Sequence, residues 1–257
     1  MTLPVLVFLH GFLGTGAQWN PVRRALAKWP TLAPDLPGHG RTPLPPHTLH
    51  FDWLSAWLDA WLDTQQVGKA VLIGYSMGGR LAWHFAVHHP GRLVGLAIEG
   101  AAPGICNALA RDQRRAADAA RAARIRQVGL RTFAEEWYRQ PLFHSLAEQP
   151  VLLSRAVQSA SRQDAKAMAR VIAELSPGRQ PPLWDALPTL DIPTLLIAGA
   201  RDAKYAALLD EAAALMPRAQ RINIPGAGHN AHLEQSAAFA EAVRAWLERE
   251  QIMRPCD

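Results

Sequence analysis

The sequence is poor in the features that mark membrane, exported and disulfide-bonded proteins. No apolar run approaches the roughly 18 residues that a membrane helix needs. The first residues, MTLPVLVFLHGF, lack the charged region and the cleavage site of a signal peptide. The chain has two cysteines, Cys106 and Cys256, and their spacing fits neither a disulfide framework nor a zinc module. We therefore expect a soluble, cytoplasmic protein that contacts no membrane.

Low-complexity tracts are also missing, and charged residues are sparse. The 257 residues are 49% hydrophobic and 19% charged, which excludes intrinsically disordered and fibrous proteins. A chain of this length can form one folded unit. No nucleotide, flavin or metal-binding motif is present, so we expect no cofactor and no bound metal. We also expect a monomeric globular protein.

The surplus positive charge is confined to one segment. The net charge is +5, and residues 105–180 hold twelve arginines and Lys166 against seven acidic residues. Such a segment indicates either a nucleic-acid face or a pocket for a small polyanion. Aromatic residues are not interleaved with a Lys/Arg run, which favours the pocket. We expect a small polyanionic carboxylate as partner, no nucleic acid, and most of these arginines, Arg121 among them, on solvated helix faces.

The first third of the chain alternates apolar strands with amphipathic helices. Such alternation predicts βαβ units and a doubly wound, mostly parallel sheet. Trp53, Trp57 and Trp61 recur every four residues, so we expect them to face the core. The predicted strands are 5–9, 31–33, 70–73 and 93–98, and the predicted helices are 19–29, 51–66 and 78–88.

The alternation stops in the middle of the chain and then returns. Between Pro103 and Pro182 only helical periodicity is visible, which predicts an inserted helical lid over residues 104–182. The core then comprises residues 1–103 and 183–257. In its second part we expect strands over 193–198 and 220–224 and helices over 206–215 and 236–251.

A G-x-S-x-G motif marks the most reactive position. Gly74-Tyr75-Ser76-Met77-Gly78 follows a predicted strand and opens a predicted helix, which is the context of a nucleophile elbow. The tight turn forces an unusual backbone conformation on the serine, and the flanking glycines remove side chains that would collide with neighbouring backbone. The motif predicts Ser76 as a catalytic residue.

A serine hydroxyl needs an imidazole, and the imidazole needs a carboxylate that fixes its tautomer. Asp202 follows one predicted strand and His229 follows the next, in the order Ser, acid, His. Both therefore lie at carboxyl ends of strands, where open α/β sheets bind ligands. We predict the triad Ser76, Asp202 and His229. The other histidines considered, His39, His84, His88, His89 and His232, are expected to be ordinary surface or core residues.

A glycine-containing loop after the first strand completes the predicted machinery. His10-Gly11-Phe12 places a backbone N–H, that of Phe12, beside the N–H of Met77. Two such donors form an oxyanion hole for developing negative charge.

These motifs carry a resemblance to known families. The HGF, DLPGHG, GYSMGG, GARD and GAGH blocks resemble the α/β-hydrolase superfamily over nearly the whole chain. The blocks GYSMGGR, EGAAPGICNALAR, WYRQPLF, GARDAKY and GAGHNAH are similar to the 2-succinyl-6-hydroxy-2,4-cyclohexadiene-1-carboxylate (SHCHC) synthases of menaquinone biosynthesis. The resemblance implies an α/β-hydrolase fold with a lid. It also implies a lyase that uses its triad as a general base to eliminate pyruvate from 2-succinyl-5-enolpyruvyl-6-hydroxy-3-cyclohexene-1-carboxylate.

The same resemblance implies a set of substrate-binding residues. Arginine suits a substrate with three carboxylates because its guanidinium forms two-pronged pairs. The positions that match the family are Tyr75, Arg80, Arg114, Trp137 and Arg155, with Arg162 as the alternative to Arg155.

Two other functions fit parts of the sequence. A serine carboxylesterase or carbon–carbon bond hydrolase would use the same triad, with Ser76 as nucleophile. Ester pockets are mainly apolar, so the arginine-rich lid favours the lyase. A non-catalytic binding protein on this fold is disfavoured by the intact triad.

Overall fold

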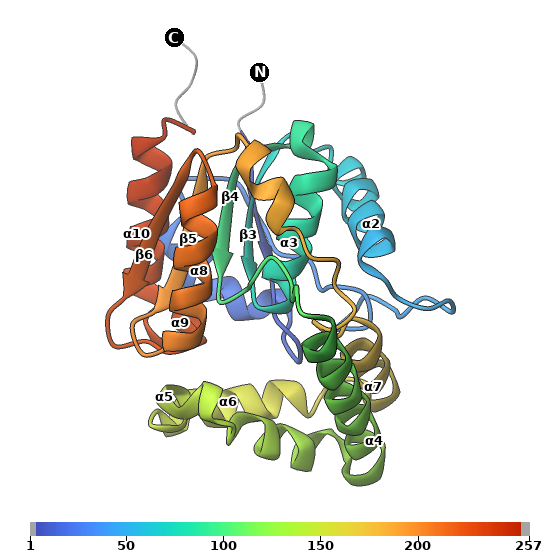
Figure 1. The fold of residues 1–257 in the computed structure, drawn as a ribbon. Coiled ribbons are helices and arrows are strands. Elements are labelled where there is room, and N and C mark those ends of the chain that lie inside the picture. The colour runs from blue at the N-terminus through green and yellow to red at the C-terminus, as the bar shows by residue number, and fades with distance from the viewer. Residues whose placement is uncertain (1–3, 253–257) are drawn as a thin grey trace.

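The computed structural model describes residues 4–252 and contains a six-stranded parallel sheet (Figure 1). Cys256 lies outside the described residues. The strand order is β2-β1-β3-β4-β5-β6. The strands are β1 (Val5–Leu9), β2 (Thr31–Leu32), β3 (Ala70–Tyr75), β4 (Leu93–Glu99), β5 (Thr194–Gly199) and β6 (Ala219–Ile224). The predicted doubly wound, α/β-hydrolase sheet is confirmed.

The strand order determines where the loops after β1 and β3 leave the sheet. The chain runs from β1 outward to β2 and then crosses to β3 on the other side of β1, with Leu9 opposite Gly74 in register. At such a switch point the loops after the two central strands diverge and leave a crevice. The HGF loop after β1 and the serine turn after β3 therefore emerge side by side.

Helices cover both faces of the sheet because its central strands are apolar on both faces. One face packs against α1 (Asn20–Ala25) and α10 (Ser236–Arg249). The other packs against α2 (Phe51–Thr64), α3 (Met77–His88) and α8 (Ala203–Leu215). Short helical turns are η1 (Gly16–Trp19), η2 (Pro90–Arg92), η4 (Trp184–Thr189) and α9 (Ala231–Glu234). Within residues 4–252, none of the helices combines the length and apolar character that crossing a bilayer requires.

Two details of the helices differ from the prediction. The helix expected over 19–29 is a 3₁₀ turn followed by α1, which ends at Ala25. In α2 the fully buried stripe is Leu54, Leu58 and Leu62, whereas Trp53, Trp57 and Trp61 are half-buried along its flank. The leucine stripe has the same four-residue spacing one position later, so periodicity alone did not separate the two stripes.

The chain between β4 and β5 forms a helical insertion, which we call the lid (Figure 1). It contains α4 (Ala108–Tyr138), η3 (Pro141–Phe143), α5 (His144–Ala147), α6 (Pro150–Ala160) and α7 (Ala165–Glu174). Gly129, at φ 75° and ψ 168°, interrupts α4. In Figure 1 the lid lies across the edge where the strands end. The two ends of the lid meet, because Leu183 N donates a hydrogen bond to Pro103 O at 3.0 Å.

Candidate active site

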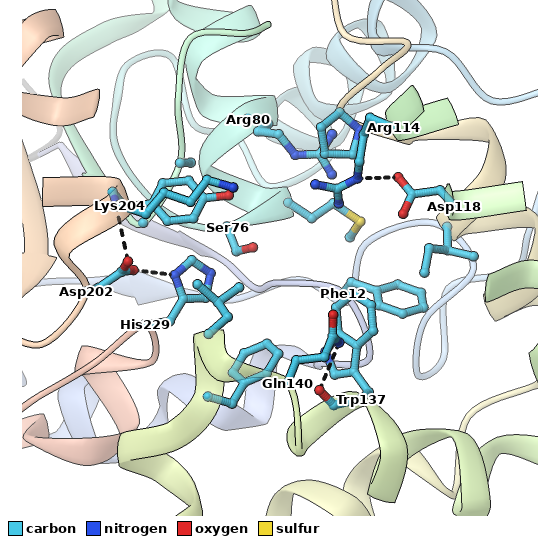
Figure 2. Close-up of a pocket in the computed structure, with 18 of the residues that line it drawn as sticks. Phe12, Ser76, Arg80, Arg114, Asp118, Trp137, Gln140, Asp202, Lys204 and His229 are labelled. Carbon is cyan, nitrogen blue, oxygen red and sulfur yellow. Dashed lines mark hydrogen bonds and ion pairs between the residues drawn. The ribbon is translucent and has the colours of Figure 1, made fainter. Parts of the chain in front are cut away.

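A cavity of about 450 Å³ lies between the carboxyl edge of the sheet and the lid (Figure 2). This volume is within the range of roughly 300–1,000 Å³ for small-molecule sites. The core and the lid both supply its walls. Its lining includes Phe12, Ser76, Met77, Arg80, Asp202 and His229 from the core, and Arg114, Asp118, Arg121, Trp137 and Gln140 from the lid.

Ser76 occupies a sharp turn between β3 and α3. Its φ is 49° and its ψ is −109°, a conformation that L-residues rarely adopt. A Cβ on Gly74 would lie 2.5 Å from Gly78 O, and one on Gly78 would lie 2.3 Å from Leu9 O. Both glycines are therefore required for α3 to pack this close to the strands, which holds the Ser76 side chain at the cavity wall.

Asp202 and His229 form a buried pair beside Ser76. The His229 Nδ1 atom donates to Asp202 Oδ2 at 2.7 Å, and the two side chains are 1% and 3% exposed. Asp202 lies three residues after the end of β5, at the N-cap of α8, where it also accepts from Tyr205 N at 3.2 Å. With the proton on Nδ1, the other ring nitrogen is free to accept a proton. Figure 2 shows that nitrogen turned into the cavity, on the side where Ser76 lies.

The loop that carries His229 is held by carboxylates that the sequence did not single out. Glu234 accepts from Gly228 N at 2.9 Å and from Asn230 N at 3.2 Å. Glu99, at the end of β4, lies 2.9 Å from His232 Nδ1, and both side chains are buried. These groups lie on opposite sides of His229 in the chain and fix the path of the loop.

The predicted oxyanion loop is fixed through its histidine. Phe12 and Met77 both line the cavity, and Met77 is the first residue of α3, where backbone N–H groups are unpaired within the helix. His10 Nε2 accepts from Leu36 N at 2.9 Å. Burial lowers the pKa of His10 to about 4, so the ring stays a neutral acceptor at pH 7.

Arg80 and Arg114 bring two positive charges to the same wall. Arg80 Nη1 donates to Leu175 O at 2.8 Å, and its guanidinium lies 5.3 Å from the Phe51 ring centroid. Burial and the neighbouring charge of Arg114 lower the pKa of Arg80 to about 10, which leaves it charged at pH 7. This mutual repulsion favours an anion bound between them.

Asp118 and Arg121 complete this charged wall, and the expectation that Arg121 is on a solvated face is wrong. Asp118 is fully buried and accepts from Arg114 Nε at 2.7 Å, from Arg121 Nη1 at 2.6 Å and from Ser176 Oγ at 2.6 Å. Arg121 lines the cavity. The spacing 114, 118 and 121 places all three on one face of α4, a signal that was present in the sequence.

Trp137 supplies an apolar wall next to these charges. Its ring meets Phe12 edge to face at a centroid distance of 5.3 Å, and the Arg121 guanidinium lies 5.6 Å from its centroid. Trp137 thus places an aromatic surface in the cavity wall between Phe12 and Arg121.

The structure does not bring Tyr75, Arg155 or Arg162 into the cavity lining. Tyr75 ends β3 with its side chain buried in the opposite apolar cluster, where its hydroxyl donates to Asn230 Oδ1. Arg155 and Arg162 are exposed on the lid. Successive residues of a strand point to opposite faces, so the position before Ser76 turns away from the cavity.

Comparison with known proteins agrees with this arrangement. A model of the alpha/beta hydrolase family matches residues 6–242. The 2-succinyl-6-hydroxy-2,4-cyclohexadiene-1-carboxylate synthase of Serratia proteamaculans is 37% identical over 95% of this chain and 93% of its own. The chain belongs to the SHCHC synthase family.

Two solved structures are similar to this SHCHC synthase family member. The structure of MenH from S. aureus is similar with a TM-score of 0.92 and 33% identity, covering 98% of this chain and 96% of that one. A thermophilic esterase from Thermogutta terrifontis, solved with malate bound, is similar with a TM-score of 0.85 and 28% identity. The matched region covers 99% of this chain and 92% of the esterase chain.

Proposed function

We propose that this protein is a carbon–oxygen lyase that eliminates pyruvate from 2-succinyl-5-enolpyruvyl-6-hydroxy-3-cyclohexene-1-carboxylate and yields SHCHC. Membership of the synthase family supports this reaction. The observation that carries the proposal is the charge of the cavity. Arg80, Arg114 and Arg121 line it, and within that lining Asp118 is shared by two of them. Surplus guanidinium charge beside a serine suits a substrate with several carboxylates.

The triad acts as a general base in this reaction. His229, oriented by Asp202, accepts the proton of the Ser76 hydroxyl, and the Ser76 oxygen removes the proton next to the succinyl carbonyl. The electron pair of that C–H bond forms a double bond between ring carbons 2 and 3, the existing double bond shifts from carbons 3 and 4 to carbons 4 and 5, and the bond from carbon 5 to the enolpyruvyl oxygen breaks. The leaving enolate takes up a proton and becomes pyruvate, so atoms and charges balance.

Fixed donors stabilise the negative charge that develops during this step. The N–H groups of Phe12 and Met77 bind an anionic oxygen of the substrate, and the three arginines hold its carboxylates. The arginine wall and the serine line one cavity, so binding orients the C–H bond toward the base. A proton abstraction of this kind needs neither a metal ion nor a redox group.

Ester hydrolysis is the second candidate function. The likeness to the esterase favours it, and the His229–Asp202 pair beside Ser76 would serve that reaction as well. In that reaction Ser76 would attack a carbonyl and form an acyl-enzyme. The charged wall distinguishes the two candidates, because a simple ester offers no partner for it.

A coupled assay tests the proposal directly. The purified protein is mixed with the enolpyruvyl substrate, and pyruvate release is followed together with the intact mass of the protein during turnover. We expect stoichiometric pyruvate and an unmodified chain. An acyl adduct on Ser76 would assign the protein to the hydrolases, as would cleavage of a separately added simple ester by a protein that releases no pyruvate.

The arginines provide the matching variants. We expect Arg80→Ala and Arg114→Ala each to cost about 2–5 kcal/mol in kcat/KM, because each leaves a substrate carboxylate poorly paired. Arg80→Lys restores the charge but not the two-pronged geometry and stays impaired. Wild-type kinetics in both alanine variants would remove the basis of the polyanion pocket.

A further inference from the structure

A second cluster of chemistry-bearing side chains lies where α2 meets α3, away from the cavity lining. Asp52 comes from the first turn of α2, and His84 and His88 come from α3. One carboxylate oxygen and one nitrogen from each ring all lie within 4.8 Å of one another. Both histidines were expected to be ordinary surface or core residues, and the carboxylate beside them comes from more than thirty positions earlier in the chain.

His84 is the unusual member of this cluster. Its side chain is 1% exposed, and neither ring nitrogen makes a hydrogen bond within the part of the chain that the structure describes. Nε2 approaches Asp52 Oδ1 to 3.0 Å without hydrogen-bond geometry. The approach of Asp52 offsets part of the hydration that Nε2 loses on burial, whereas Nδ1 has no polar partner among the described residues, so the burial of this ring is incompletely compensated. A metal ion bound to it would remove this cost.

The helical spacing provides the second ligand. His84 and His88 are four residues apart on α3, and their ring centroids are 4.2 Å apart. Histidines at this spacing lie on one face of a helix, as in metal sites built on a single helix. Asp52 is 73% exposed and His88 is also exposed, so both side chains can rotate toward an ion at His84.

We propose that Asp52, His84 and His88 form a binding site for a divalent transition-metal ion of the zinc type. Two imidazoles and one carboxylate suit Zn²⁺, whose bonds to nitrogen and oxygen are about 2.0–2.2 Å long. Water completes a tetrahedral site on the exposed side. Mg²⁺ and Ca²⁺ are excluded because they prefer sets of oxygen ligands.

The neighbouring histidine belongs to the helix cap. His50 Nδ1 is 3.7 Å from Asp52 Oδ2, but the same atom accepts from Trp53 N at 3.2 Å and caps α2. His50 therefore serves as a neighbour of the site and is left out of the ligand set.

An ion at this position would join two helices that shape the active site. His84 lies one turn after Arg80 on α3, and the Phe51 ring of α2 contacts both, at 5.3 Å from the Arg80 guanidinium and 6.0 Å from the His84 ring. Metal binding adds a cross-link between α2 and α3 and stabilises the folded chain by mass action. The expected effect is structural, so it is measured without reference to the enzyme's activity.

The test uses the full-length, untagged protein after treatment with a chelator. Isothermal titration with Zn²⁺, with Mg²⁺ as the negative control, measures the stoichiometry, and thermal unfolding measures the stabilisation. We expect one Zn²⁺ per chain, a higher Tm with Zn²⁺ and no response to Mg²⁺. Asp52→Ala and His88→Ala change exposed side chains and should each weaken Zn²⁺ binding by about tenfold or more.

Two controls separate this site from other zinc ligands. His144→Ala removes a histidine that is 78% exposed on the lid, and Cys106→Ser removes an exposed thiol. Both should bind Zn²⁺ as the wild type does. Equal binding in Asp52→Ala, His88→Ala and the wild type would overturn the proposal, as would the absence of a one-to-one Zn²⁺ titration in the wild type.

Discussion

Single side chains set the charge and the reactivity of the cavity. Ser76 has its hydroxyl at the cavity wall because its backbone adopts a positive φ between two glycines. Asp118 gives the arginine wall its order, since it binds Arg114 and Arg121 at once from a fully buried position. The reactive group and the charged wall are therefore both fixed before a substrate arrives, which lowers the entropy cost of catalysis.

Replacement of the serine tests the proposed base. We expect Ser76→Ala to lower kcat for pyruvate release by about 10³-fold or more, because the triad acts as one unit. Folding, measured by thermal unfolding, should be retained. Ser154→Ala, on the exposed side of α6, is the matched control and should have wild-type kinetics. Near-full pyruvate release by Ser76→Ala would remove Ser76 from the mechanism.

Two lid arginines test which of them contacts the substrate. Arg121 lines the cavity and Arg155 is exposed outside it. We expect Arg121→Ala to raise KM about tenfold or more through the loss of a charged contact. Arg155→Ala should leave KM and kcat unchanged. The opposite ranking in steady-state kinetics would restore the assignment that family resemblance suggested for Arg155.

At the scale of whole elements, local sequence patterns predicted the strands and helices but not the faces that they turn toward the cavity. The main strands and the nucleophile elbow could be predicted because each depends on contiguous residues. The side chain of Tyr75 could not be placed, because the face of a strand is defined only once the sheet is assembled. For Arg121 the spacing to Arg114 and Asp118 was visible in the sequence, but only the packing of the lid on the core makes that face of α4 a cavity wall.

The interruption of α4 at Gly129 leads to a prediction about stability. Gly129 has φ 75° and ψ 168°, a region open almost only to glycine. We expect Gly129→Ala to lower the free energy of unfolding by about 1–3 kcal/mol, although no atom lies within 4 Å of the added Cβ. Gly91→Ala, which also adds a Cβ in open space but at an ordinary φ, is the control. Equal denaturant midpoints for the two variants would contradict the strain.

The whole molecule should lose stability in mild acid. Burial lowers the pKa of His10 to about 4 and the pKa of His39 well below its usual value, so the unfolded chain binds more protons below pH 6.5. Stability therefore rises with pH through this range and falls as the pH drops. His10 alone should account for a loss of about 2 kcal/mol between pH 7 and pH 5. Denaturant unfolding at the two pH values measures it.

A variant at His10 tests whether this residue causes the loss of stability between pH 7 and pH 5. His10→Gln keeps an acceptor for Leu36 N but does not titrate, so its unfolding free energy should fall less between pH 7 and pH 5 than that of the wild type. An unchanged slope in His10→Gln would mean that other groups carry the pH dependence.

The meeting of the two lid ends has a consequence for how this fold diversifies. Pro103 and Leu183 are hydrogen-bonded neighbours, so the intervening segment is attached to the core as a closed loop. Ser76, Asp202 and His229 all lie outside that loop, whereas Arg114 and Arg121 lie inside it together with their shared Asp118. If the lid arginines bind the substrate as proposed, we expect this one continuous segment to carry part of the substrate preference. Exchange of one continuous stretch of coding sequence would then replace the arginine wall with an apolar one and leave Ser76, Asp202 and His229 unchanged.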